Sequence, residues 1–200
     1  MVVPPPFRTA SRMIDEKAQL RRLVRFRRRE FVDHAGAATC SLHALAMGHI
    51  LFEKLRGTSA VAVYLSNGRE VSPQPLAELA WAAGMSVALP AFADRTSPMR
   101  FARWCPDDRL VAGPYGVPQP LAAAPSLDPD VIVTPLVAFD RSGARLGQGG
   151  GHYDRAFALY PEARRIGLAW SVQEIAHVPV ESWDKPLHAV ATEKEWIDCA

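Results

Sequence analysis

The sequence has few of the features that direct a chain to a membrane, an oxidising compartment or a nucleic acid. Its three cysteines, Cys40, Cys105 and Cys199, are widely spaced and follow no metal-binding pattern, so we interpret them as reduced thiols of a cytoplasmic protein. The first residues, Met1 to Met13, include three prolines and no long apolar run, which predicts neither a signal peptide nor a membrane span. The formal net charge of +2 is too small to indicate nucleic-acid binding.

What is present is the composition of a soluble globular protein, with 48% hydrophobic and 22% charged residues. Two hundred residues suit one domain with a sizeable core. We expect residues 1–14 to form a flexible leader and residues 15–200 to form a single domain. No heptad repeat indicates assembly.

The hydrophobic pattern alternates between helix-type and strand-type segments. Helical spacing predicts helices over 15–34, with Asp15 as the N-cap, and over 41–54, 75–84 and 154–159. Apolar β-type runs predict strands over 60–65, 86–90, 130–135 and 165–170. This alternation is typical of a three-layer α/β domain with a largely parallel sheet between helices.

A stripe of basic residues follows one side of the first expected helix. Lys17, Arg21, Arg25 and Arg28 recur there at three- and four-residue spacing. Such a stripe is typical of a solvated helix face, and also of an arginine-rich arm that binds RNA. The residues alone leave both interpretations open.

A glycine-rich loop provides the strongest sequence signal. Gly147, Gly149, Gly150 and Gly151 fall within five residues, between a buried strand and a helix expected to start at Asp154. Glycines reach positive φ easily and expose backbone N–H groups, so a strand–glycine loop–helix order suits a bound phosphate. The Walker and dinucleotide motifs are both absent, and a bare glycine loop is also typical of a flexible surface turn. Nor is there a Gly-x-Ser-x-Gly elbow or a convincing Cys/His pair, so no covalent nucleophile is predicted.

The residues around these glycines are more specific than the glycines. The string Phe139-Asp140-Arg141-x-Gly143-x-Arg145-Leu146-Gly147-x-Gly149-x-Gly151-His152-Tyr153-Asp154-Arg155 resembles the signature of the 5-formyltetrahydrofolate cyclo-ligase family. Three further segments resemble elements of this family: Lys17-Ala18-Gln19-Leu20-Arg21, the stretch 99–104 and the closing stretch 173–193. The resemblance runs from Lys17 to Glu193.

The resemblance implies a Rossmann-like fold related to the ribose-isomerase and CoA-transferase architecture. It implies an ATP- and Mg²⁺-dependent ligase that converts 5-formyltetrahydrofolate to 5,10-methenyltetrahydrofolate and releases ADP and phosphate. In this reaction the formyl oxygen is phosphorylated and N10 then closes the ring. The expected protein is a cytoplasmic monomer whose partners are a reduced folate and ATP, with neither membrane nor nucleic acid.

The same resemblance assigns the site residues. Catalytic roles fall on Arg145 and Asp154, and Asp154 is the expected Mg²⁺ ligand. ATP-binding roles fall on Lys17, Arg21, Arg145, Gly147, Gln148, Gly149, Gly150, Gly151 and Asp154. Folate-binding roles fall on Leu65, Glu70, Met99, Trp104, Gln148, His152 and Tyr153. We interpret Arg22, Arg27 and Arg29 as solvent-exposed charges.

Some assignments keep an alternative. Glu70 also fits an exposed loop carboxylate, and Met99 and Trp104 equally suit an ordinary core. The arginines that meet the glutamate end of the folate are left open among Arg100, Arg103 and Arg109.

The sequence departs from the family pattern at two positions. His188 stands where an aspartate is expected that can bind magnesium in relatives, so we carry no ligand role onto it. His152 stands where tyrosine is common. The His188 departure favours an alternative, a non-catalytic or substrate-shifted paralogue that keeps the nucleotide loop. A nucleic-acid-binding module built on Arg21 to Arg29 is a further alternative, which leaves the glycine string unexplained.

Overall fold

The computed structural model describes residues 10–199, with side chains from Ile14 onward. Most of the expected flexible leader therefore lies outside the described residues. The first helix, α1 (Ala10–Lys54), begins before residue 15, so residues 10–14 are helical. Asp15 lies inside this helix, and its expected role as the N-cap is wrong because the chain already supplies a helical turn before it.

A seven-stranded sheet with the order β11-β10-β9-β6-β1-β2-β3 forms the centre of the molecule. The two edge strands, β3 and β11, run antiparallel to their neighbours, and the five inner strands are parallel. The strands are β1 (Ala60–Ala62), β2 (Ser86–Ala91), β3 (Arg100–Arg103), β6 (Val131–Pro135), β9 (Arg164–Leu168), β10 (Ala189–Ala191) and β11 (Trp196–Asp198). The predicted α/β class with a largely parallel sheet is confirmed. Strand β1 ends earlier than the run 60–65 suggested.

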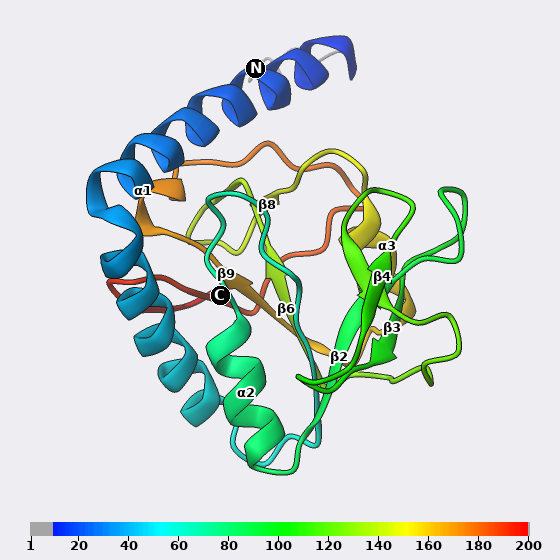
Figure 1. Cartoon of the computed structure of the whole chain (residues 1–200). Helices are drawn as coiled ribbons and strands as arrows, with labels where there is room; N and C mark the ends of the chain where they lie inside the picture. The colour runs from blue at the N-terminus through cyan, green and yellow to red at the C-terminus, as the bar shows by residue number, and fades with distance from the viewer. Residues whose placement is uncertain (1–9, 200) are drawn as a thin grey trace.

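Helices cover both faces of the sheet, as Figure 1 shows. Alternate residues of β6 point to opposite faces: Val131 and Val133 join the core under α1 and α2 (Gln74–Ala82), whereas Ile132 joins the core under α3 (His152–Leu159). The continuous apolar run in this strand is the pattern expected for a strand buried on both faces.

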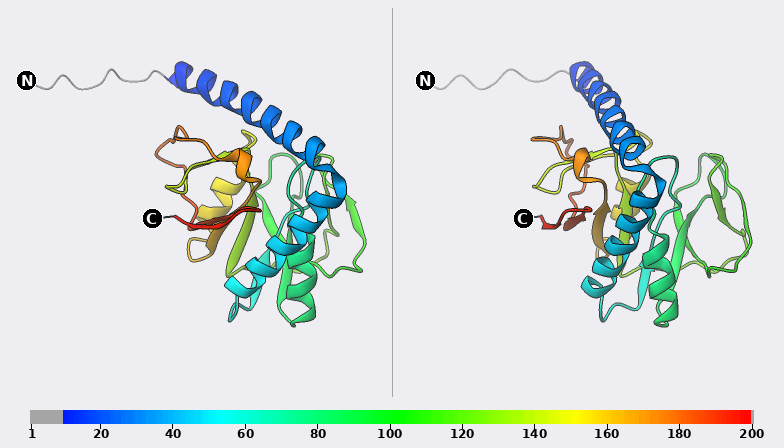
Figure 2. Two further views of the ribbon diagram at one scale, coloured as in Figure 1. Left: turned by 90° about the vertical axis from the view of Figure 1, so that its left-hand side faces the viewer. Right: turned by 60° about the vertical axis from the view of Figure 1, so that its left-hand side comes forward.

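Helix α1 is divided by a kink at Gly36 (φ 78°, ψ 160°). The two expected helices, 15–34 and 41–54, are thus its two halves, joined by a kink instead of a loop. The second half lies beside α2 and buries Met47 and Leu51 against the sheet. The first half leaves the sheet and crosses over the loops at its edge (Figure 2).

Between Ile14 and Lys54, α1 is long and apolar enough to cross a membrane by length and composition alone. One such helix is weak evidence, because core helices of soluble proteins have the same length and apolar character.

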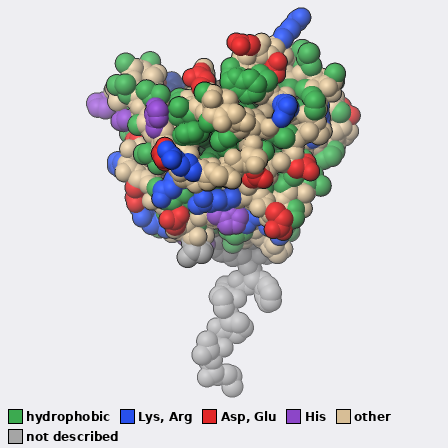
Figure 3. Space-filling view, turned by 90° about the horizontal axis from the view of Figure 1, so that it is seen from below, with side chains coloured by type: hydrophobic (Ala, Val, Ile, Leu, Met, Phe, Trp, Pro, Cys, Tyr) green, Lys and Arg blue, Asp and Glu red, His purple; other side chains and the backbone are tan. Residues whose placement is uncertain are grey.

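The face of the molecule seen in Figure 3 mixes hydrophobic side chains with charges of both signs.

Two small antiparallel ribbons complete the fold. One joins β4 (Leu110–Ala112) and β5 (Pro118–Pro120), and the other joins β7 (Ala138–Phe139) and β8 (Arg145–Leu146). A short 3₁₀ helix, η1, spans Ser171–Gln173. The β7–β8 ribbon leads into the glycine loop, and its Leu146 packs in a small core with Leu20 and Val24 of α1. This core fixes the first half of α1 against the glycine loop.

Candidate active site

A pocket of about 830 Å³ lies where the first half of α1 faces the glycine loop. The chain segments that follow β1 and β2 form part of its wall, so it opens beyond the carboxyl ends of parallel strands. The β4–β5 connection and the loop 181–184 close its sides. All the residues that the sequence singled out for ATP and for folate therefore line one cavity, except Trp104.

The glycine loop follows β8 directly and leads into α3. Gly149 (φ 108°) and Gly151 (φ 63°) have backbone conformations that favour glycine, which explains the residue type at both positions. A side chain at Gly149 would begin 3.6 Å from the guanidinium of Arg21, so the loop passes close to α1. The Arg21 Nε donates a hydrogen bond to the Gly147 carbonyl (2.9 Å). Helix and loop thus form one cationic corner of the pocket.

Arg145 lies beneath this loop and pairs with Asp154 in the first turn of α3. The Arg145 Nη2 and Asp154 Oδ1 atoms are 2.5 Å apart, and the Arg145 side chain is only 5% exposed. Its guanidinium also lies over the rings of Phe157 (5.3 Å) and Tyr153 (5.9 Å). The Arg145 Nε is buried without a hydrogen-bond partner. Burial and these contacts fix the arginine in place.

Lys17 faces two carboxylates that sequence reasoning did not assign to the site. Its Nζ lies 2.8 Å from Glu181 Oε2 and 3.1 Å from Asp184 Oδ2. The Asp184 carboxylate also accepts a hydrogen bond from the Glu181 N–H (2.9 Å). The available signal was the closing stretch of the family resemblance, which contains both carboxylates. Lys17, Glu181 and Asp184 all line the pocket.

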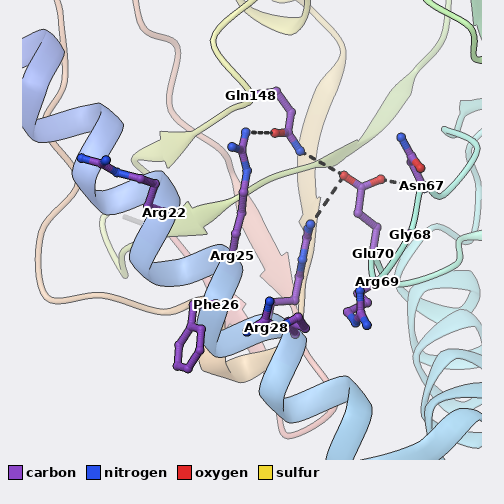
Figure 4. A pocket seen from close by; sticks show the side chains of 10 residues that line it. Arg22, Arg25, Phe26, Arg28, Asn67, Gly68, Arg69, Glu70 and Gln148 are labelled. Atoms are coloured by element: carbon purple, nitrogen blue, oxygen red, sulfur yellow. Dashed lines mark hydrogen bonds and ion pairs between the residues drawn. The ribbon is translucent and has the colours of Figure 1, made fainter.

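Glu70, in the segment after β1, lies beside Arg28 of α1, farther along the helix than Lys17. Its side chain is only 10% exposed. Its Oε2 accepts a hydrogen bond from the Asn67 N–H (3.0 Å), and its Oε1 accepts one from Gln148 Nε2 (3.4 Å) and lies 3.8 Å from Arg28 Nη1 (Figure 4). Arg25 in turn donates to Gln148 Oε1. The alternative of an exposed loop carboxylate is therefore wrong for Glu70, and the stripe on α1 is not simply a solvated face.

Apolar and aromatic side chains form the remaining wall. Leu65, Met99 and Tyr153 line it, as the resemblance implied. The rings of Phe92, Tyr115 and His152 meet one another with all three centroid separations at 5.0 Å. Phe92 and Tyr115, together with the pocket residue Tyr64, were not predicted, because each belongs to a segment whose place at the pocket depends on long-range folding.

The titratable groups of this wall are held in their neutral forms. Burial raises the pKa values of Tyr64 and Tyr153, so both remain phenols near neutral pH. Burial and then the charge of Arg155 lower the pKa of His152. Its Nδ1 lies 3.1 Å from Arg155 Nη2, which can only donate, so the ring accepts there as a neutral imidazole.

Two positions that the sequence singled out, Trp104 as a folate-binding residue and His188 as a departure from the family pattern, lie away from the pocket. Trp104 is 8% exposed and packs in the core under α1 and α2, so it follows the ordinary-core alternative. His188 packs against Arg165, whose backbone N–H donates to His188 Nδ1 (2.9 Å). The His188 departure from the family pattern therefore lies outside the lining of the pocket.

None of the three arginines considered for the folate tail, Arg100, Arg103 and Arg109, lines the pocket. Arg100 donates to the carbonyls of Ala122 and Ala124, and Arg103 donates to Ser86 Oγ.

The pocket contains oxygen donors suited to magnesium. Asp154, Glu181 and Asp184 line it. Within residues 14–199, however, no three or more His, Cys, Asp or Glu side chains come together closely enough to hold a metal ion by themselves. Mg²⁺ is usually held by one or two carboxylates together with phosphates and waters. Asp154, which presents its carboxylate beside the glycine loop, fits this pattern.

Comparisons with known proteins agree with the geometry. Residues 13–193 match the 5-formyltetrahydrofolate cyclo-ligase family. The chain is 39% identical over 144 residues to 5-formyltetrahydrofolate cyclo-ligase of Escherichia coli K12, covering 68% of this chain and 79% of the relative. It is 34% identical over 161 residues to that of Haemophilus influenzae, covering 77% and 83%.

Solved structures give the same result for the fold. The solution structure of Aquifex aeolicus 5,10-methenyltetrahydrofolate synthetase matches with a TM-score of 0.71 and 25% identity, covering 91% of this chain and 92% of that one. The Mycoplasma pneumoniae 5,10-methenyltetrahydrofolate synthetase matches with a TM-score of 0.66 and 20% identity, covering 88% and 98%. The family match over residues 13–193 and the relatives of 34–39% identity establish that the chain belongs to the 5-formyltetrahydrofolate cyclo-ligase family.

Proposed function

We propose that this enzyme, an ATP-dependent ligase, converts 5-formyltetrahydrofolate to 5,10-methenyltetrahydrofolate in the pocket between α1 and the glycine loop. The observation that carries the proposal is that one cavity has a cationic phosphate-type corner and an apolar aromatic wall, with Gln148 between them. The two substrates can then meet at the glycine loop.

The chemistry explains why both substrates must share a cavity. An N-formyl amide is a poor electrophile, and its oxygen is a poor leaving group. Transfer of the γ-phosphoryl group from ATP to the formyl oxygen gives ADP and an iminium phosphate. The N10 nitrogen then attacks the formyl carbon and gives up its proton, the C–O bond breaks, and phosphate leaves with the bonding electrons and takes up that proton. The protein's task is to position the reactants and neutralise charge, so the lack of a covalent nucleophile is in keeping with this reaction.

The nucleotide lies, in this proposal, along the first half of α1. Ile14, Lys17 and Arg21 recur at i, i+3 and i+7, so they share one face of the helix. Lys17, Arg21, Arg145 and the loop N–H groups hold the phosphates. Ile14 (65% exposed) and Trp183 (62% exposed) line the pocket beside Lys17 and offer apolar surface to the base.

The folate lies on the opposite side. Leu65, Met99 and Tyr153 suit a flat heterocycle, and the ring trio of Phe92, Tyr115 and His152 closes this wall. Glu70 supplies a carboxylate acceptor for ring N–H groups. Glu70 lines the pocket even with its present hydrogen bonds, so it can exchange the hydrogen bond that it accepts from Gln148 for one from the substrate.

Magnesium would be held by Asp154, with Asp184 as a second oxygen donor lining the same pocket. When bound with ATP, this ion supplies positive charge that neutralises the phosphates. In the protein itself, Asp154 holds Arg145 in place and Lys17 balances Asp184. We further propose that the protein is a cytoplasmic monomer.

The test is an absorbance assay for the methenyl product. Purified protein is mixed with 5-formyltetrahydrofolate, ATP and Mg²⁺, with parallel reactions that omit ATP or the metal. Product in the complete mixture alone is the expected result. Binding of ATP without product would instead favour a paralogue that has lost folate chemistry. His188 does not favour this alternative, because it lies outside the pocket lining.

A further inference from the structure

The substrate pocket has no excess of positive charge, although the proposed function requires it to bind a triphosphate. Among the described residues, three basic side chains and four carboxylates line it: Lys17, Arg21, Arg145, Glu70, Asp154, Glu181 and Asp184. A triphosphate without a metal ion brings several negative charges, so it meets repulsion from these carboxylates as well as attraction from the cations. The side chains of the pocket are therefore poorly matched to a bare polyanion.

Glu181 is the carboxylate of this pocket that the protein holds least firmly. Its side chain is 30% exposed, against 10–24% for the other three carboxylates. Its Oε2 accepts a hydrogen bond from Lys17 Nζ (2.8 Å), which is the only donor to this carboxylate among the described residues. By contrast, Asp184 also accepts a hydrogen bond from a backbone N–H, and Asp154 is paired with a buried arginine. Glu181 is therefore the carboxylate that can change its partner at the lowest cost.

The partner of Glu181 is a cation that the proposed function assigns to the phosphates. Lys17 is only 11% exposed, and its Nζ is shared between Glu181 and Asp184. An ammonium group has three N–H donors, so a phosphate oxygen that binds Lys17 competes with these carboxylates. Burial and the charge of Arg25 lower the pKa of Arg21, and the charge of Glu181 opposes this shift, which places Glu181 near Arg21 as well. Glu181 thus acts on both phosphate-type cations of α1.

We propose that Glu181 is a specificity-determining residue that makes the pocket reject triphosphates in their metal-free form, because its carboxylate competes with phosphate for Lys17 and repels the bare polyanion. This inference rests on the proposed function. The repulsion is weaker for a triphosphate whose charge a divalent cation has reduced, and its phosphate oxygens can then replace the carboxylate at Lys17. The rejection depends on charge and not on the base, so it extends to inorganic tripolyphosphate.

The test is equilibrium binding of ATP, and separately of tripolyphosphate, without folate and in the presence of either Mg²⁺ or a chelator. Wild-type protein should bind both ligands more weakly in the chelator. Glu181→Gln keeps the shape of the side chain and removes its charge, so it should tighten metal-free binding about tenfold and change binding with Mg²⁺ by less than about threefold. Glu181→Asp keeps the charge and should retain most of the discrimination.

Glu174→Gln is the matched control. Glu174 is 32% exposed and paired with an arginine at 2.7 Å, much as Glu181 is paired with Lys17, but it does not line the pocket. This variant should bind both ligands as the wild type does under both conditions.

Unchanged metal-free binding in Glu181→Gln would overturn the proposal. So would equal tightening in Glu174→Gln, because the net charge of the protein would then explain the effect. A large loss of binding with Mg²⁺ in Glu181→Gln would also overturn it, and would show that Glu181 holds the metal. Because these measurements need no folate, they are separate from the test of the proposed function. Absence of methenyl product would refute that function, while the binding data would still decide the role of Glu181.

Discussion

The guanidinium of Arg145 and the carboxylate of Asp154 meet beneath the glycine loop, with Nη2 and Oδ1 2.5 Å apart. The Arg145 side chain is 5% exposed, whereas that of Asp154 is 24% exposed and keeps an edge in the pocket. The same carboxylate therefore neutralises a buried arginine and lines the pocket in which we propose that magnesium binds. The observed ion pair and the proposed metal role predict two measurable effects of one substitution.

Asp154→Asn should lower kcat/KM for Mg-ATP by about 100-fold, because the neutral amide binds magnesium poorly. It should also lower the free energy of unfolding by about 2 kcal/mol, because Arg145 stays buried without its charged partner. Turnover measured over a range of Mg²⁺ concentrations tests the first effect, and urea denaturation tests the second. Asp198→Asn, at an exposed position, is the control. Wild-type turnover in Asp154→Asn would refute its role.

Lys17→Ala should raise the KM for ATP about tenfold, with a much smaller change in the KM for folate. The substitution removes a cation that we propose binds phosphate, and it leaves Glu181 and Asp184 facing the pocket unneutralised. Steady-state kinetics with each substrate varied in turn separate the two constants. Lys185→Ala provides the control, because Lys185 directly follows Asp184 in the chain but does not line the pocket. A defect confined to folate would contradict the assignment.

Trp183→Ala should raise the KM for ATP about tenfold, since stacking of a base on an aromatic ring is worth roughly 1–3 kcal/mol. Inhibition by inorganic tripolyphosphate should be unchanged, because this compound has phosphates but no base. Trp81→Ala is the matched control: Trp81 is 45% exposed on α2 and does not line the pocket. Equal weakening of ATP and tripolyphosphate would mean that Trp183 acts on the phosphates instead.

His188→Asn should make the protein less sensitive to acid. Burial, followed by the charges of Arg165 and Arg164, lowers the pKa of His188 in the folded state. The unfolded chain therefore takes up a proton first, so the stability that the neutral ring contributes is complete above about pH 6.5 and is lost as pH falls through the folded pKa. Urea denaturation between about pH 7.5 and pH 5.5 should show a smaller loss of stability in the variant. His152, whose pKa is also lowered, remains and leaves some dependence.

His188→Asp should leave the magnesium dependence of turnover unchanged. The ring lies against Arg165 and outside the pocket lining, so a carboxylate at this position has no route to the metal. Magnesium titration of the assay measures this directly. A tighter dependence would show that position 188 reaches the metal during turnover.

The sequence predicted the local parts of the site better than the parts assembled by folding. Gly147, Asp154 and Tyr153 belong to one short stretch, whose spacing alone places them together. Phe92 and Tyr115 come from separate segments, and their contact with His152 depends on the path of the β4–β5 ribbon. No local pattern records that path.

Some residues carried a signal that suited two environments. Trp104 had the aromatic character of either a ligand wall or a core, and packing under α1 and α2 decides for the core. The start of α1 was placed too late because Asp15 is a good N-cap residue, and propensity alone does not show whether a helix continues before it.

The kink at Gly36 makes the first half of α1 a lever. From Gly36 to Lys17 the helix extends about 28 Å, so a rotation of about 10° at the kink would move Lys17 by about 5 Å. A Cβ atom at Gly36 would meet nothing within 4 Å, so alanine would act there only through the backbone angle that it disfavours. Relaxing that angle would move Lys17 and Arg21 relative to the glycine loop, while Met47 and Leu51 keep the second half of α1 packed on the sheet. One methyl group at position 36 would then change how Lys17 and Arg21 face the glycine loop.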